Sequence, residues 1–165
     1  MKIAQRMALT GMTAAVYAAL TVLLPIPAYG DIQCRLSESL CLLAFLNPVF
    51  APGIILGCFI ANLFSPIGLP DVVFGTLASA LSMLGVVKYS KNLFTASLWP
   101  VVVNGLVIGA MILFFFTEPP HTVVKYIMFA ATVMLGQFVA VSVAGVVIFS
   151  RVMKNKRLMG FIKNL

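Results

Sequence analysis

Acidic residues are scarce in this chain: its 165 residues include four Asp or Glu against eleven Lys or Arg. Charged side chains make up 9% of the sequence and hydrophobic ones 62%, and the mean hydropathy is +1.11. Water-soluble proteins are about one-quarter charged and about half apolar. The composition therefore excludes a soluble domain and predicts an integral membrane protein.

The residue sets that carry out most enzymatic chemistry are also missing. The chain has one His and three Cys (Cys34, Cys41 and Cys58), without the spacing of a metal site. No nucleophile–base pair is recognisable, and no Walker-type glycine loop is present. We therefore expect neither an enzyme nor a cofactor or metal site, and any ATP-driven step would need another chain.

Prolines and polar turn residues divide the apolar sequence into segments, and the length leaves room for about five or six helices of roughly 20 residues. Breaks at Pro25, Asn47-Pro48, Pro66 to Pro70, Lys88 to Asn92 and Pro119-Pro120 predict six helices, at 3–24, 37–47, 51–64, 71–87, 95–116 and 121–153. The second and third are marginal in length for a full bilayer crossing.

The basic residues agree with this even number of helices. Lys2, Arg6, Lys88, Lys91 and the tail residues Arg151, Lys154, Lys156, Arg157 and Lys163 all fall on one predicted side. Positive charges flanking membrane helices mark the cytoplasmic side, so the net charge of +7 does not indicate nucleic-acid binding. The predicted fold is an all-α integral membrane protein, a six-helix transmembrane bundle in which residues 1–165 form one domain and both termini are cytoplasmic.

Polar residues gather where three predicted helices meet the outer face: Gln33, Arg35, Glu38, Asn62 and Asp71. Ionisable groups in membrane segments are costly and usually functional, so we expect a binding site for a polar, cationic small molecule. Two structural alternatives stay open. Arg35 and Glu38 are three residues apart and could pair along one helical turn, and Asp71 could simply stabilise a helix N-terminus.

Two amides lie deeper, Asn104 in the fifth predicted helix and Gln137 in the sixth. Each could hydrogen-bond between helices or contact a ligand.

Small residues recur along the first predicted helix at spacings of three and four: Ala4, Ala8, Gly11, Ala15 and Ala19, with Ala14 and Ala18 beside them. Such residues allow another helix to approach closely. The ridge could pack inside the bundle or form a docking face for a separate membrane protein.

Four motifs, taken in order, resemble the QueT family. They are Gln33-x-Arg35-Leu36-Ser37-Glu38, Gly57-Cys58-x-x-Ala61-Asn62, Asp71-x-x-Phe74-Gly75-Thr76-Leu77-Ala78 and Trp99-Pro100-x-x-x-Asn104. The family comprises substrate-binding S components of energy-coupling-factor (ECF) transporters. One departure is Gln137, where the family pattern often has a Glu after the glycine.

The resemblance implies uptake of a queuosine precursor, such as 7-aminomethyl-7-deazaguanine, across the bacterial cytoplasmic membrane. It also implies partners: an EcfT-like membrane coupling protein and two ATPase subunits. An alanine-rich face of the first helix would dock onto the coupling protein, through Ala14 and Ala18 or through Ala15 and Ala19. We assign the outer cluster, Asn104 and Gln137 to the substrate. The alternative is a stand-alone secondary transporter or exporter of a small cationic heterocycle, although no inverted repeat is apparent.

Overall fold

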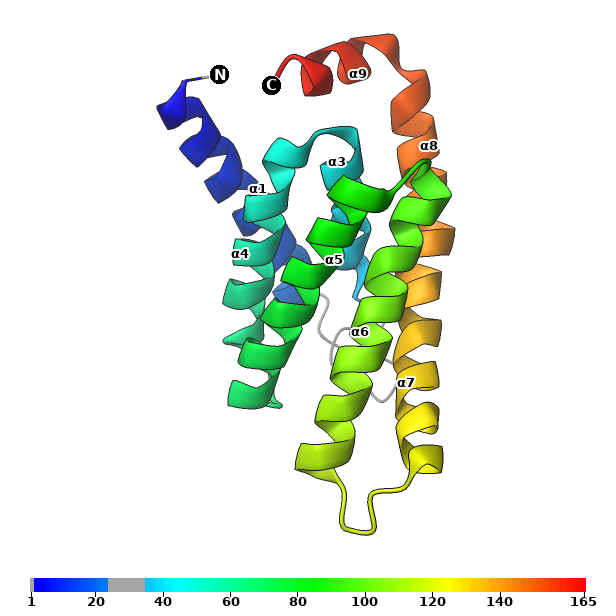
Figure 1. Cartoon of the computed structure of the whole chain (residues 1–165). Coiled ribbons are helices and arrows are strands. Elements are labelled where there is room, and N and C mark those ends of the chain that lie inside the picture. The colour runs from blue at the N-terminus through cyan, green and yellow to red at the C-terminus, as the bar shows by residue number, and fades with distance from the viewer. Residues whose placement is uncertain (1, 24–34) are drawn as a thin grey trace.

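Every element of the computed structural model is a helix within residues 2–23 and 35–165, the part of the chain that the structure describes (Figure 1). The elements are α1 (Ile3–Leu23), η1 (Leu36–Leu40), α3 (Cys41–Leu46), η2 (Pro48–Phe50), α4 (Ala51–Asn62), η3 (Asp71–Gly75), α5 (Thr76–Tyr89), α6 (Leu93–Phe116), α7 (Val123–Gln137), η4 (Phe138–Gly145), α8 (Val146–Lys154) and α9 (Lys156–Lys163). The prediction of an all-α fold is confirmed.

Four helices in the described ranges are long and apolar enough to cross a membrane: Ile3–Leu23, Asp71–Tyr89, Leu93–Phe116 and Val123–Lys154. Two shorter apolar helices, Leu36–Leu46 and Pro48–Asn62, lie where the sequence predicted short ones. The break between them forms because the Asn47 backbone is extended and the Asn47 side chain accepts a hydrogen bond from the Val49 amide.

Capping residues explain where two of the long helices begin. α6 starts two residues earlier than predicted because Asn92 and Thr95 form a reciprocal capping box. α7 starts two residues later than predicted because the Thr122 side chain accepts a hydrogen bond from the Lys125 amide.

Short side chains let the helices approach one another closely. A Cβ atom added to Gly57 of α4 would lie 2.7 Å from the Tyr17 Cβ of α1, and one added to Gly109 of α6 would lie 2.8 Å from the Ala130 backbone of α7. Interfaces of this kind are typical of helices in lipid, where close packing replaces the hydrophobic effect as the driving force.

The sequence did not predict α9, because its residues lie in the basic tail that follows the last predicted helix. Asn155 ends α8 and caps α9, because its side chain accepts hydrogen bonds from the Arg157 and Leu158 amides. α9 then crosses the end of the bundle near the start of α1 (Figure 1). Its Ile162 side chain is buried against the core, and the Ile162 carbonyl accepts a 2.7 Å hydrogen bond from Asn47 Nδ2.

We expect Asn47→Ala to release α9 from the bundle. The substitution removes both the cap of η2 and the bond to Ile162, and losing a cap alone costs about 1 kcal/mol. Hydrogen exchange should accelerate in residues 156–163 and stay unchanged in α6. Asn92→Ala, which removes the cap of α6, is the matched control and should leave α9 exchange as it is. Unchanged exchange of α9 in Asn47→Ala would contradict this prediction.

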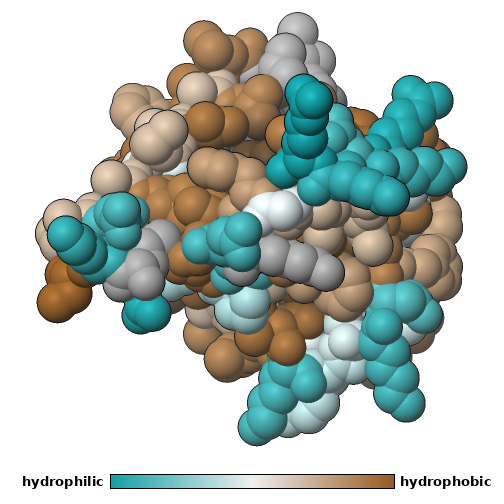
Figure 2. All heavy atoms as spheres, turned by 90° about the horizontal axis from the view of Figure 1, so that it is seen from above, coloured by the Kyte–Doolittle hydropathy of each residue, from teal (hydrophilic) through white to brown (hydrophobic). Residues whose placement is uncertain are grey.

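The start of α1 and the C-terminal helix lie at the same end of the bundle (Figure 1). Seen from that end, hydrophilic side chains lie at several places, most of them near the outline, with apolar surface between them (Figure 2). The α6–α7 loop, which contains Glu118 and His121, lies at the opposite end (Figure 1). His121 is exposed.

Candidate functional site

A salt bridge between Arg35 and Asp71 forms the first half of the candidate site. Arg35 precedes η1 and Asp71 begins η3, so 36 positions of sequence separate them. Arg35 Nη2 lies 2.7 Å from Asp71 Oδ2, and Arg35 Nη1 donates to Asn62 Oδ1 at 2.8 Å. The Asn62 amide in turn donates to the Asp71 backbone carbonyl at 3.0 Å. The three predicted residues therefore form one buried network.

The local backbone places Asp71 and Asn62 against each other. Residues 71–75 form a π-helical turn, a rare conformation that often marks functional sites. Gly75 ends that turn, and a Cβ there would lie 2.5 Å from Asn62 Nδ2 and 3.2 Å from Asp71 Oδ1. The glycine of this motif is thus required by the close approach of the Asn62 side chain.

Glu38 forms the second half of the site and is 1% exposed. The Tyr17 hydroxyl of α1 donates to Glu38 Oε1 at 2.6 Å, and the Cys41 thiol donates to Oε2 at 3.2 Å. Beside this carboxylate, the Thr21 and Ser37 hydroxyls lie 2.6 Å apart and join α1 to η1. Neutral donors from two elements therefore hold Glu38.

This pairing corrects the alternatives that were left open for the charged residues. Arg35 is the counter-ion of Asp71, and no salt bridge joins it to Glu38 in the described part of the chain. Asp71 is more than an acid at a helix N-terminus, because it is fully buried and ion-paired. The local spacing of three residues instead joins Glu38 to Cys41.

Both carboxylates keep hydrogen-bonding capacity. A carboxylate offers about four lone-pair sites. Glu38 accepts one described donor at each oxygen, and Asp71 Oδ1 has no partner among the described residues. The two halves adjoin along α4, where Gly57 contacts Tyr17 and the following residue, Cys58, accepts from the Asn62 amide at 3.4 Å. The arrangement can therefore accept several further donors within one buried region.

The deeper amides do not pair with each other. Asn104 Nδ2 and Gln137 Oε1 are both buried without a hydrogen-bond partner in the described ranges. A polar contact between α6 and η4 does exist nearby, but Ser97 and Ser142 make it, at 2.9 Å. Gln137 directly precedes the π-helical segment η4, so a wide helical turn lies beside a predicted site residue here as it does at Asp71. Gln33 lies outside the described residues.

The small residues of α1 fall on two different faces. Ala14 and Ala18 are buried, and Ala14 packs against Gly57 of α4. Ala15 and Ala19 are exposed, in line with Ala8 and Gly11. A Cβ added to Gly11 would meet no other atom within 4 Å. Internal packing therefore explains the first pair, and the second pair belongs to an outward-facing ridge.

Sequence reasoning gave no role to the residues that support the site, although Ser37 and Cys58 stand in the quoted motifs; they are Tyr17, Thr21, Ser37, Cys41 and Cys58. A signal existed for Cys41, which lies three residues after Glu38, the same spacing that was considered for Arg35. Nothing in the sequence pointed from Tyr17 to Glu38. Across residues 2–23 and 35–165, no three His, Cys, Asp or Glu side chains are grouped to hold a metal ion.

Comparison with known proteins agrees with this architecture. The family model described as QueT transporter matches residues 7–154, which contain every described candidate residue of the site. Neither a search of curated proteins nor a search of solved structures gave a match. The family is a transporter family and not an enzyme family. Because the match spans most of the 165 residues, the chain belongs to the QueT transporter family.

Proposed function

We propose that this membrane protein is the substrate-binding S component of an ECF-type importer and takes up a queuosine precursor such as 7-aminomethyl-7-deazaguanine. The observation that carries the proposal is the buried cluster of two carboxylates, one guanidinium and one amide in a chain with so few charged residues. Burying such groups in a membrane protein is costly, and a ligand that uses them explains why they are there.

The ligand chemistry matches the free capacity of the site. A 7-deazaguanine presents an N–H and an amino group on one edge, and a carboxylate accepts such a pair of donors side by side. We assign this edge to Glu38, whose two oxygens the Tyr17 hydroxyl and the Cys41 thiol hold in place. The aminomethyl cation needs a second carboxylate, and Asp71 Oδ1 has no described partner.

Acceptors on the ligand need donors from the protein. Among the described residues, the Asn104 Nδ2 group is a buried donor without a partner, and Gln137 Oε1 is a buried acceptor without one. Unpaired buried amides cost about 1–3 kcal/mol each, so a substrate that satisfied both would gain affinity. Gln137 accepts without carrying charge, whereas a Glu there would add a third carboxylate to the site.

Glu38→Gln is expected to weaken binding of 7-aminomethyl-7-deazaguanine by more than about tenfold, which corresponds to about 1.4 kcal/mol. The amide replaces one acceptor oxygen by a donor and removes the negative charge. Isothermal titration calorimetry on the purified protein measures the change. Glu118→Gln is the matched control, because Glu118 is exposed in the α6–α7 loop and should keep full affinity. Unchanged affinity in Glu38→Gln would remove Glu38 from the site.

Energy coupling by partner proteins is the second part of the proposal. We infer a membrane coupling protein and two ATPases, with the ridge at Ala15 and Ala19 as the contact, and the basic end of the bundle in the cytoplasm. Liposomes that contain only this chain should bind the substrate without moving it. Movement of substrate down its gradient without any ATPase would instead support the stand-alone carrier.

A further inference from the structure

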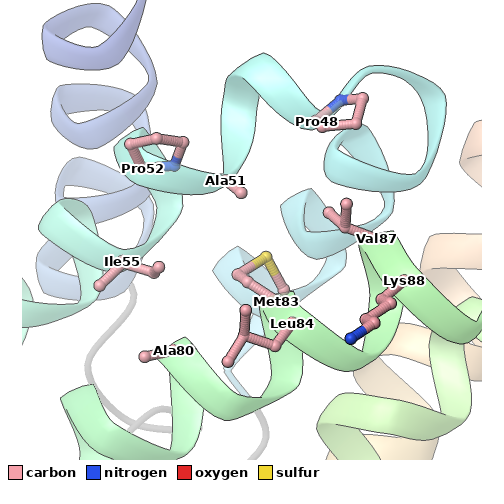
Figure 3. A pocket seen from close by; sticks show the side chains of 9 residues that line it. All are labelled: Pro48, Ala51, Pro52, Ile55, Ala80, Met83, Leu84, Val87 and Lys88. Atoms are coloured by element: carbon pink, nitrogen blue, oxygen red, sulfur yellow. The ribbon is translucent and has the colours of Figure 1, made fainter.

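A groove between α5 and the η2–α4 segment contains none of the residues of the proposed substrate site. It has a volume of about 580 Å³, and its walls are Pro48, Ala51, Pro52 and Ile55 on one side and Ala80, Met83, Leu84, Val87 and Lys88 on the other (Figure 3). The hollow exists because the facing side chains are short, with two prolines and two alanines among them. Met83, which is buried in the core, forms part of its wall.

One positive charge stands at the rim of this apolar groove. Lys88 is its sole charged lining residue, and the described acids lie elsewhere: Glu38 and Asp71 are in the buried site, and Glu118 is at the opposite end of the bundle. The Lys88 ammonium lies 5.5 Å from the centre of the Tyr89 ring and forms no salt bridge with a described residue. The rim is therefore complementary to an anion.

The aromatic residues around Lys88 indicate its depth in the bilayer. Tyr89 packs against Trp99, the sole tryptophan of the chain, with ring centres 5.7 Å apart. Tyr and Trp gather at the level of the lipid headgroups. From this level the groove follows α5 back from Lys88 to Ala80, about 12 Å at 1.5 Å per residue. Its charged rim thus lies beside the headgroups, and its apolar floor lies beside the acyl chains.

We propose that this groove binds an anionic phospholipid, with one acyl chain between α4 and α5 and the phosphate beside Lys88. Basic sites between helices on the cytoplasmic side of membrane proteins hold anionic headgroups in this way. A transmembrane helix fits less well, because a cylinder about 10 Å wide and about 12 Å long fills roughly 900 Å³. The groove offers about 580 Å³.

Native mass spectrometry of the full chain, mixed with phosphatidylglycerol or phosphatidylcholine of identical acyl chains, tests the proposal. The wild type should retain phosphatidylglycerol preferentially. Lys88→Gln should reduce that retention by about fivefold, the effect of one lysine facing an anionic surface. Lys91→Gln is the matched control, since Lys91 is exposed in the neighbouring turn and does not line the groove. It should leave retention unchanged.

A second variant tests the groove itself. Ala80→Phe should fill the apolar floor and reduce retention of both lipids, while binding of the deazaguanine stays unchanged. If that variant does not fold, the comparison of Lys88→Gln with Lys91→Gln decides alone. Equal retention of the two lipids, or equal effects of the two lysine variants, overturns the proposal. A dimer that Ala80→Phe abolishes would show a second copy of the chain in the groove and overturns it as well.

Discussion

Removing the Asp71 carboxylate is expected to destabilise the protein by about 3–5 kcal/mol, because it breaks the buried ion pair that Asp71 forms with the Arg35 guanidinium. Asp71→Ala should therefore unfold well below the wild-type temperature in detergent. The Asn62 amide would keep its hydrogen bond to the backbone carbonyl of residue 71. The loss of stability therefore measures the removal of the Asp71 side-chain carboxylate. Glu118→Ala, at an exposed acid, is the control and should melt like the wild type.

The double variant Arg35→Met/Asp71→Leu separates stability from binding. Replacing both members of a buried ion pair with apolar residues is often neutral or stabilising. We expect the double variant to melt closer to the wild type than Asp71→Ala does, and to bind the deazaguanine at least about tenfold more weakly. Full affinity together with restored stability would show that the pair is purely structural. Stability as low as that of Asp71→Ala would contradict the assignment of the loss to the broken Arg35–Asp71 ion pair.

The sequence predicted the helices well because their ends are determined locally. Asn47-Pro48 breaks the long apolar stretch through its own backbone and side chain, and the structure has the break there. α9 escaped prediction because it is short, eight residues long, and its apolar residues stand between basic ones at Lys156, Arg157 and Lys163. What makes it a helix is partly distant, since Ile162 enters the core and its carbonyl is held by Asn47, 115 positions away.

The composition of the site was predictable, and its pairing was not. Glu38, Asn62 and Asp71 stood out because polar groups are costly in an apolar chain. Sequence spacing, however, reveals only partners on the same helix, and Arg35 finds its partners on α4 and η3. The same limit explains Tyr17, which looks like an ordinary residue of an apolar helix until the fold brings its hydroxyl to Glu38.

The spacing of small residues along α1 could not show which face of the helix is free to dock onto a partner. Ala14 and Ala18 have the same spacing as Ala15 and Ala19, so both pairs could serve a close helix contact. Only the fold separates them, because Ala14 lies against Gly57 of α4 and Ala18 is in the core, whereas Ala15 and Ala19 are exposed. Of the four long apolar helices, α1 is also the least buried, with 28% of its apolar window covered. Its exposed side is therefore available to a further helix.

Ala15→Trp is expected to abolish co-purification with the coupling protein while leaving substrate affinity and melting temperature unchanged. Ala15 is exposed, so a large ring there blocks the close approach of another helix from outside the bundle. Ala14→Trp is the matched control from the neighbouring face, where a large side chain would collide with Gly57 of α4. Overpacking of a tight contact costs about 1–3 kcal/mol or more, so Ala14→Trp should melt at a lower temperature and bind the substrate more weakly.

If Ala15→Trp co-purifies with the coupling protein as the wild type does, the docking surface lies elsewhere than on this ridge. Loss of substrate binding in Ala15→Trp would mean that the ridge packs inside the bundle. The proposed docking face and the substrate site lie on different sides of α1, so a substitution on the docking face alone should leave substrate binding intact.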